Sequence, residues 1–123
     1  MASTSGNKGQ GSKWISKHKR LAIYIRDGFC CAYCGTNLKG EAPARLTLDH
    51  LTPRHFGGGN EAGNLVLACL SCNSSRGDRA LEVFAPGGAL ERIAALRVAP
   101  LNIELAKALI AGTAGNPAAE AAR

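Results

Sequence analysis

Four of the five cysteines stand as two pairs, each with two residues between its members. Cys31 and Cys34 form the first pair, and Cys69 and Cys72 form the second. At this spacing one tight turn can bring two thiolates to a single ion, and two such turns complete a tetrahedral site of four sulfurs. We therefore expect these four cysteines to hold a structural zinc ion, which would help to stabilise a chain of only 123 residues.

The fifth cysteine, Cys30, directly precedes the first pair. Because adjacent residues on a turn point their side chains in different directions, we expect Cys30 to be a small thiol outside the site. The register in which Cys30 pairs with Cys34 is the alternative. A thiol redox protein that uses Cys30, Cys31 and Cys34 is a rival interpretation, but two pairs in one small chain favour zinc.

The segment between the cysteine pairs contains residue types that suit the hydrolysis of a phosphodiester. Asp49 and His50 are followed by a loop with a proline and three successive glycines, then by Asn64, and Asn73 directly follows the second pair. The reaction needs a base that deprotonates water and a cation that neutralises charge on the phosphate. Histidine ordinarily titrates near neutral pH, so His50 suits the base. Asp49 should point to the other side of its strand and can serve the cation.

In this order of residues the stretch 20–79 resembles the HNH nucleases, which have a ββα-metal fold. The resemblance implies that Asp49 and Asn73 bind the catalytic cation, that His50 activates water, and that Asn64 ties the intervening loop. Many relatives carry histidine where Asn73 stands, so the chain resembles an HNN variant. Magnesium or manganese suits these oxygen ligands. Asn73 as a mere helix-start residue is the alternative.

The positive charge of the chain indicates a polyanionic partner. Lysine and arginine outnumber the acidic residues by 15 to 9, and the excess lies toward the start of the sequence. Together with the resemblance this predicts DNA, whereas an ordinary solvated basic tail is the alternative. The residues expected to contact DNA are Lys13, Lys17, Lys19, Arg20, Arg54, His55, Arg76 and Arg79. For His55 simple solvation is the usual role, and the glycines at 57–59 predict flexibility near the DNA.

Apolar spacing and breaker residues predict the order of the elements. We expect a basic amphipathic helix over 13–27, strands over 44–48 and 64–68, and a helix after the second cysteine pair that breaks near Gly77. Asp78 should cap a short continuation through Phe84, and two packing helices should follow over 89–98 and 102–111, the latter capped by Asn102.

The predicted fold is α+β: a small zinc-stabilised ββα-metal core, similar to a treble clef, with a basic helix before it and a helical extension after it. Residues 13–84 should form the nuclease domain with its zinc site. Residues 85–112 should pack on this core, and 1–12 and 113–123 should be disordered tails.

The resulting prediction is a metal-dependent DNA endonuclease that nicks DNA or cuts both strands. The resemblance implies products with 5′-phosphate and 3′-hydroxyl ends. A zinc-dependent module that binds DNA without cutting it is the main rival. One site cuts one strand, so a double-strand cut would need a homodimer, two events or a partner; a phage packaging terminase is a partner by analogy with small relatives in phage and mobile-element gene sets. Without a membrane-spanning run or secretory signal, we expect the protein in the cytoplasm of a bacterial or phage-infected cell.

Overall fold

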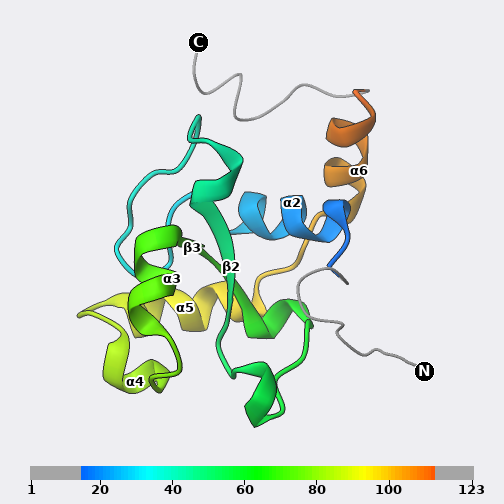
Figure 1. Ribbon diagram of the computed structural model, residues 1–123. Coiled ribbons are helices and arrows are strands. Elements are labelled where there is room, and N and C mark those ends of the chain that lie inside the picture. The colour runs from blue at the N-terminus through cyan, green and yellow to red at the C-terminus, as the bar shows by residue number, and fades with distance from the viewer. Residues whose placement is uncertain (1–14, 113–123) are drawn as a thin grey trace.

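The computed structural model describes residues 15–112, in which five α-helices surround a two-stranded antiparallel hairpin (Figure 1). Strand β2 spans Leu46–His50 and β3 spans Leu65–Cys69. In their register Leu46 lies opposite Cys69 and His50 lies opposite Leu65. Both predicted strands are present, displaced by one or two residues along the chain. Because strand residues alternate between faces, Asp49 and His50 point to opposite sides of the hairpin.

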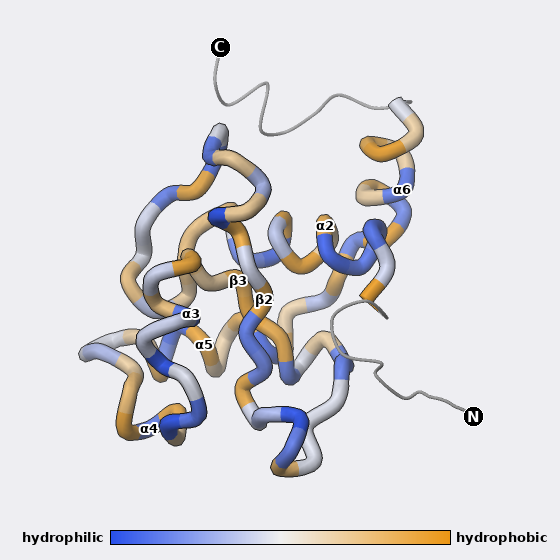
Figure 2. Tube along the Cα trace, viewed as in Figure 1, coloured by the Kyte–Doolittle hydropathy of each residue, from blue (hydrophilic) through white to orange (hydrophobic). Residues whose placement is uncertain are grey.

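The hydrophobic core is built around β3, which Figure 2 shows as an apolar stretch. Its first four residues are buried, so the strand is covered on both faces. The larger cluster of buried side chains joins the first cysteine turn to β3 and to Ala89 and Ile93 of helix α5. A smaller cluster joins Leu65 to Ile15 and to Ile23 of helix α2. The hairpin is thus fixed from both sides.

Helix α2 (Lys17–Arg26) ends at Asp27 and Gly28, as predicted, but it begins later than residue 13. Ser16 is extended and its hydroxyl accepts a bond of 3.1 Å from the backbone N–H of Lys19, so it caps the helix. Lys13 lies outside the described residues. Helix α6 packs against α2, so the start of the described chain is covered by its end.

A buried ion pair that the sequence analysis did not predict holds the end of α2 against the hairpin. Arg26 Nε lies 2.6 Å from Asp27 Oδ1, and the two side chains are 1% and 0% exposed. Arg26 also donates to the carbonyls of Ala62 and Leu65, and Asp27 accepts from the N–H of Leu67 at 2.8 Å. Because both charges are paired and bonded to the backbone, their burial is tolerated.

The later helices largely follow the predictions. They are α3 (Leu70–Arg76), α4 (Leu81–Phe84), α5 (Ala89–Val98) and α6 (Ile103–Ala111). Gly77 ends α3, and the Asn102 side chain caps α6 by accepting from the N–H of Leu105 at 3.0 Å, both as expected. The predicted cap at Asp78 is wrong. Helix α4 starts two residues later, after Ala80, and has no side-chain cap.

The remaining predictions for the fold concern the chain ends and the loop. The tails expected at 1–12 and 113–123 lie outside the described residues. The loop between the strands contains two short 3-10 helices, Arg54–Phe56 and Ala62–Asn64. None of the helices within residues 15–112 is both long and apolar enough to cross a membrane.

Candidate active site and metal centre

The sulfurs of the two predicted cysteine pairs converge at the base of the hairpin. The ligand atoms of Cys31, Cys34, Cys69 and Cys72 all lie within 4.8 Å of one another. The Sγ atoms of Cys34 and Cys69 are 3.9 Å apart, and a tetrahedral ion with bonds of about 2.3 Å to sulfur needs separations of about 3.8 Å. The donor set and its spacing therefore fit zinc. Cys30 is outside this cluster and forms a β-bridge with Asn37.

The thiols of the cluster differ in acidity. Burial raises the pKa of Cys31 and of Cys72. Burial also acts to raise the pKa of Cys34, but hydrogen bonds with the side chain and backbone of Thr36 outweigh it and lower this pKa to about 6. The bonds with Thr36 therefore favour the thiolate of Cys34, the form that binds a metal.

Asp49 is held from two directions by buried side chains. Its Oδ2 atom accepts a bond of 2.7 Å from Arg76 Nη1 on α3 and another from the hydroxyl of Tyr33, which lies between Cys31 and Cys34 in the first cysteine turn. Burial and the Asp49 carboxylate raise the pKa of Tyr33. Burial tends to lower the pKa of Arg76, but the bond to Asp49 raises it overall. Tyr33 therefore stays neutral while Arg76 stays charged.

Asn73 lies on the same side of the hairpin as Asp49. Helix α3 contacts the face of β2 that carries Thr47 and Asp49, and Asn73 Nδ2 donates to Thr47 Oγ1 at 2.9 Å. Thr47 in turn donates to the carbonyl of Ala68 at 2.7 Å. The two residues predicted to bind the catalytic cation therefore lie on the same side of the hairpin, Asp49 on β2 and Asn73 on α3.

The imidazole of His50 is fixed by a residue to which the sequence analysis gave no role. His50 Nε2 lies 2.7 Å from Asn60 Oδ1. Because an amide oxygen only accepts, Nε2 carries the hydrogen. No hydrogen bond from the described residues reaches Nδ1. The carbonyl of Asn60 accepts from Lys19 Nζ, which ties α2 to the same loop. Within the described residues no contact joins this imidazole to Asp49 or Asn73.

Asn64 is 4% exposed and ties both ends of the loop between the strands. Its side chain accepts from the N–H of Thr52 at 2.8 Å and donates to the carbonyls of Thr52 and Gly59 at 3.1 and 2.9 Å. These are the bonds that its expected loop-tying role requires. Gly58 lies so close to these hydrogen-bonded groups that a Cβ atom there would be 1.7 Å from the Thr52 carbonyl oxygen. At Gly58 the loop therefore needs a glycine for close packing, whereas the sequence suggested flexibility.

The residues predicted to contact DNA differ in their exposure. Lys17, Arg54, His55 and Arg79 are exposed, while Lys19 and Arg20 are half-buried. The Arg79 guanidinium lies over the Phe84 ring, and His55 Nε2 is 3.7 Å from Asp78 Oδ2. Arg76 corrects the expectation: its side chain is 1% exposed and paired with Asp49. Its guanidinium holds the Asp49 carboxylate in place and is not on the surface.

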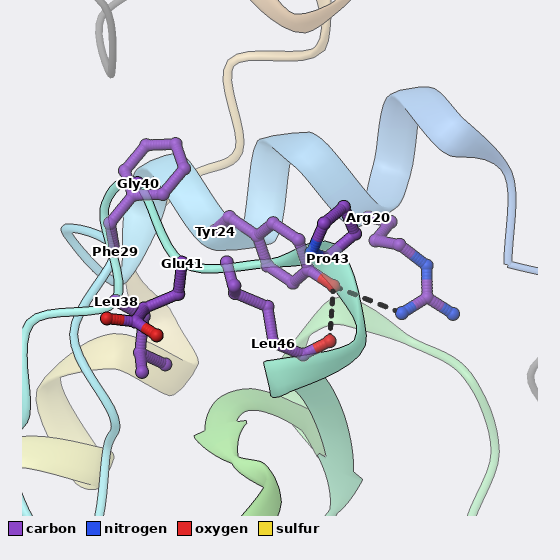
Figure 3. Close-up of a pocket in the computed structure, with 8 residues that line it drawn as sticks. All are labelled: Arg20, Tyr24, Phe29, Leu38, Gly40, Glu41, Pro43 and Leu46. Atoms are coloured by element: carbon purple, nitrogen blue, oxygen red, sulfur yellow. Dashed lines mark hydrogen bonds between the residues drawn. The ribbon is translucent and has the colours of Figure 1, made fainter.

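Arg20 borders a pocket of about 330 Å³ at the start of β2, drawn in Figure 3. Its guanidinium donates to the Tyr24 hydroxyl at 3.2 Å, and that hydroxyl donates to the carbonyl of Leu46 at 3.2 Å. Apolar parts of Phe29, Leu38 and other residues form most of the lining. None of the residues predicted for catalysis lines this pocket.

The hairpin, helix α3 and the cysteine cluster together define a small α+β domain with the order strand, strand, helix. Residues 31–79 match the family described as HNH endonuclease. The chain is also similar to the CRISPR-associated endonuclease Cas9 of Actinomyces naeslundii, with 36% identity over 67 residues. That stretch is 54% of this chain and 6% of that protein. No solved structure matches the chain.

The sequence analysis did not predict the roles of four residues that shape the site. Asn60 ends the glycine-rich loop, but nothing in the sequence shows that it reaches His50. Tyr33 carries the one available signal, since a tyrosine in a buried cysteine turn needs a partner for its hydroxyl. Thr47 and Arg26 are ordinary residues for a strand and a helix end, and only the packing reveals their bonds to Asn73 and to β3.

Proposed function

We propose that this protein is a metal-dependent DNA endonuclease that hydrolyses phosphodiester bonds. The match of residues 31–79 to the HNH endonuclease family supports nuclease activity. The observation that carries the proposal is that specific hydrogen bonds hold Asp49, His50 and Asn73, which lie at the end of β2 and on the adjoining helix α3. A module that only binds DNA has no need for such fixed orientations.

The two metal centres have separate tasks in this proposal. Zinc at Cys31, Cys34, Cys69 and Cys72 is structural, because four thiolates close the site and leave no position for substrate. Asp49 and Asn73 would hold the catalytic Mg²⁺ or Mn²⁺, whose ligands are oxygens. A divalent cation bound there supplies charge neutralisation at the scissile phosphate and the departing oxygen.

His50 acts as the general base. The bond from Nε2 to Asn60 leaves Nδ1 free to take a proton from water. The water oxygen then bonds to phosphorus as the bond from phosphorus to the 3′ oxygen breaks. The departing oxygen takes a proton from solvent water, which leaves a 5′-phosphate and a 3′-hydroxyl. Asn60 and Asn64 are positioning residues, because they hold the ring and the loop without touching the reacting atoms. One such site cuts one strand.

The DNA backbone would contact the exposed basic residues around this site. Arg54 and His55 lie on the loop that follows His50, and Arg79 follows α3. Lys17 lies on α2, and Lys19 of the same helix is bonded to this loop. Contacts of this kind to phosphates give affinity that does not depend on sequence.

A plasmid nicking assay tests the proposal. The wild-type protein should convert supercoiled plasmid to nicked circles with Mg²⁺ or Mn²⁺ and not with EDTA. His50→Ala should reduce the rate by ~10²-fold or more, the usual cost of losing a general base. His18→Ala is the matched control, since this partly exposed histidine on α2 has no role in the proposed site, and it should keep most of the rate. Wild-type protein that binds plasmid without nicking it under any ion would instead establish the DNA-binding module.

A further inference from the structure

The two proposed cation ligands each have one oxygen left for a metal. In Asp49 the Oδ2 atom accepts from both Arg76 and Tyr33. No bond from any residue within 15–112 reaches Oδ1. The carboxylate is thus anchored through one oxygen and offers the other.

Thr47 determines which end of the Asn73 amide is free. The Thr47 hydroxyl has a single hydrogen and donates it to the carbonyl of Ala68. It can therefore only accept from Asn73, which places the amide nitrogen next to Thr47 at 2.9 Å. The Oδ1 atom of Asn73 is consequently the end that remains for a cation.

The charges of this site cancel within the protein. Arg76 is buried, and its other bonds go to the neutral carbonyls of His50, Leu51 and Arg79. Asp49 is its only acidic partner in the described part of the chain. Tyr33 donates its hydroxyl hydrogen to Asp49 and adds no charge, and the other buried acid among these residues, Asp27, is paired with Arg26. One negative and one positive charge therefore stand beside the two open oxygens.

We infer that the free protein holds the catalytic cation weakly, and that the cation and a DNA phosphate bind cooperatively. This rests on the proposed function. A hard divalent ion prefers about six oxygen ligands and negative charge, and the protein supplies two oxygens with no net charge. The phosphate of the substrate provides both further oxygens and the missing negative charge. Because such coupling is reciprocal, the cation must raise the affinity for DNA by the same factor.

The test measures the dissociation constant of Mn²⁺ by electron paramagnetic resonance on zinc-loaded His50→Ala protein, which binds DNA without cutting it. Titrations run with and without a short DNA duplex, and a titration of the duplex alone gives the Mn²⁺ that DNA binds by itself. We expect the duplex to strengthen Mn²⁺ binding by about 10-fold or more. Fluorescence anisotropy should show the same factor for DNA binding with and without Mn²⁺.

A pair of substitutions at Thr47 tests the geometric part of the inference. Thr47→Val keeps the shape but removes the hydroxyl that fixes Asn73, whereas Thr47→Ser keeps the hydroxyl. In the His50→Ala protein, Thr47→Val should lose most of the coupling between Mn²⁺ and DNA, and Thr47→Ser should retain it. Thermal unfolding of each variant reports whether the fold is intact.

The outcomes separate this inference from the proposed function. If wild-type protein nicks plasmid but Mn²⁺ binds equally well with and without DNA, the cooperative site is overturned and the nuclease stands. Full coupling in a folded Thr47→Val variant overturns the orientation of Asn73. If wild-type protein never nicks plasmid and Mn²⁺ binds in neither condition, both the nuclease and the cooperative site are wrong.

Discussion

Replacing Gly58 by alanine should raise the free energy of unfolding if the loop is flexible and lower it if the loop is closely packed. In a flexible loop the extra methyl group restricts the unfolded chain and stabilises the protein by about 0.4–1 kcal/mol. In the observed loop the new Cβ would lie 1.7 Å from the carbonyl oxygen of Thr52 and 2.9 Å from Asn64 Nδ2. Both groups take part in the hydrogen bonds that hold the loop, so we expect Gly58→Ala to destabilise the protein.

The magnitude follows from the bonds that must give way. Ordinary contact begins at 3.4 Å, so the backbone of Thr52 or Gly58 has to withdraw by about half of that distance. Three hydrogen bonds lie in the path: the two between Thr52 and Asn64, and the bond of 3.0 Å from the Gly58 N–H to Pro53. At about 1 kcal/mol each, their loss costs about 2–4 kcal/mol.

Thermal unfolding followed by circular dichroism checks this value. For a domain of this size 1 kcal/mol corresponds to about 4–8 °C in Tm, so Gly58→Ala should lower Tm by about 8 °C or more. Gly63→Ala is the control in the same loop, because its Cβ would meet only the Arg97 carbonyl oxygen at an ordinary 3.5 Å. A Tm for Gly58→Ala at or above that of Gly63→Ala would refute the closely packed loop.

Three further predictions concern the metal, the base and the DNA. Cys72→Ser should lose zinc and lower Tm, while Cys30→Ala keeps both; equal zinc contents by atomic absorption would contradict the four-cysteine site. Asn60→Ala should slow nicking by about 10-fold with little change in DNA affinity, since it orients the base without contacting DNA; an unchanged rate would leave Asn60 without a role at His50. Neutralising the exposed basic residues Lys17, Arg54 and Arg79 should reduce the salt dependence of DNA binding. The slope of the logarithm of the binding constant against the logarithm of the salt concentration should fall by about one unit for each phosphate that the protein no longer neutralises. An unchanged slope would place the phosphate-binding surface elsewhere.

The features that the sequence predicted correctly depend on local spacing. A spacing of two residues between cysteines favours a tight turn wherever it occurs in a chain, and the four sulfurs lie together in one cluster. Gly28, Gly77 and Asn102 act on their own helix ends, so their effects could be predicted without knowing the packing. The cap assigned to Asp78 failed because a short helix with weak signals can start one or two residues later.

The interactions that the sequence did not predict join segments far apart in the chain. Arg76 is a basic residue near a predicted DNA-binding site, and only the packing of α3 on β2 shows that it is buried against Asp49. The bond between His50 and Asn60 likewise depends on the path of a loop rich in glycine. Such contacts are set by tertiary structure, which spacing and composition leave undetermined.

The position of Tyr33 has a consequence for protein engineering. This residue lies inside the first cysteine turn, yet its hydroxyl supports the carboxylate of Asp49, so the proposed active site cannot be transplanted as the hairpin and its loop alone. A graft needs at least residues 31–76, because it must carry both cysteine turns and Arg76. A design that replaced the cysteine cluster by apolar packing would have to return the Tyr33 hydroxyl to the same place, and a stable fold without it would be an unsuitable scaffold for cutting DNA.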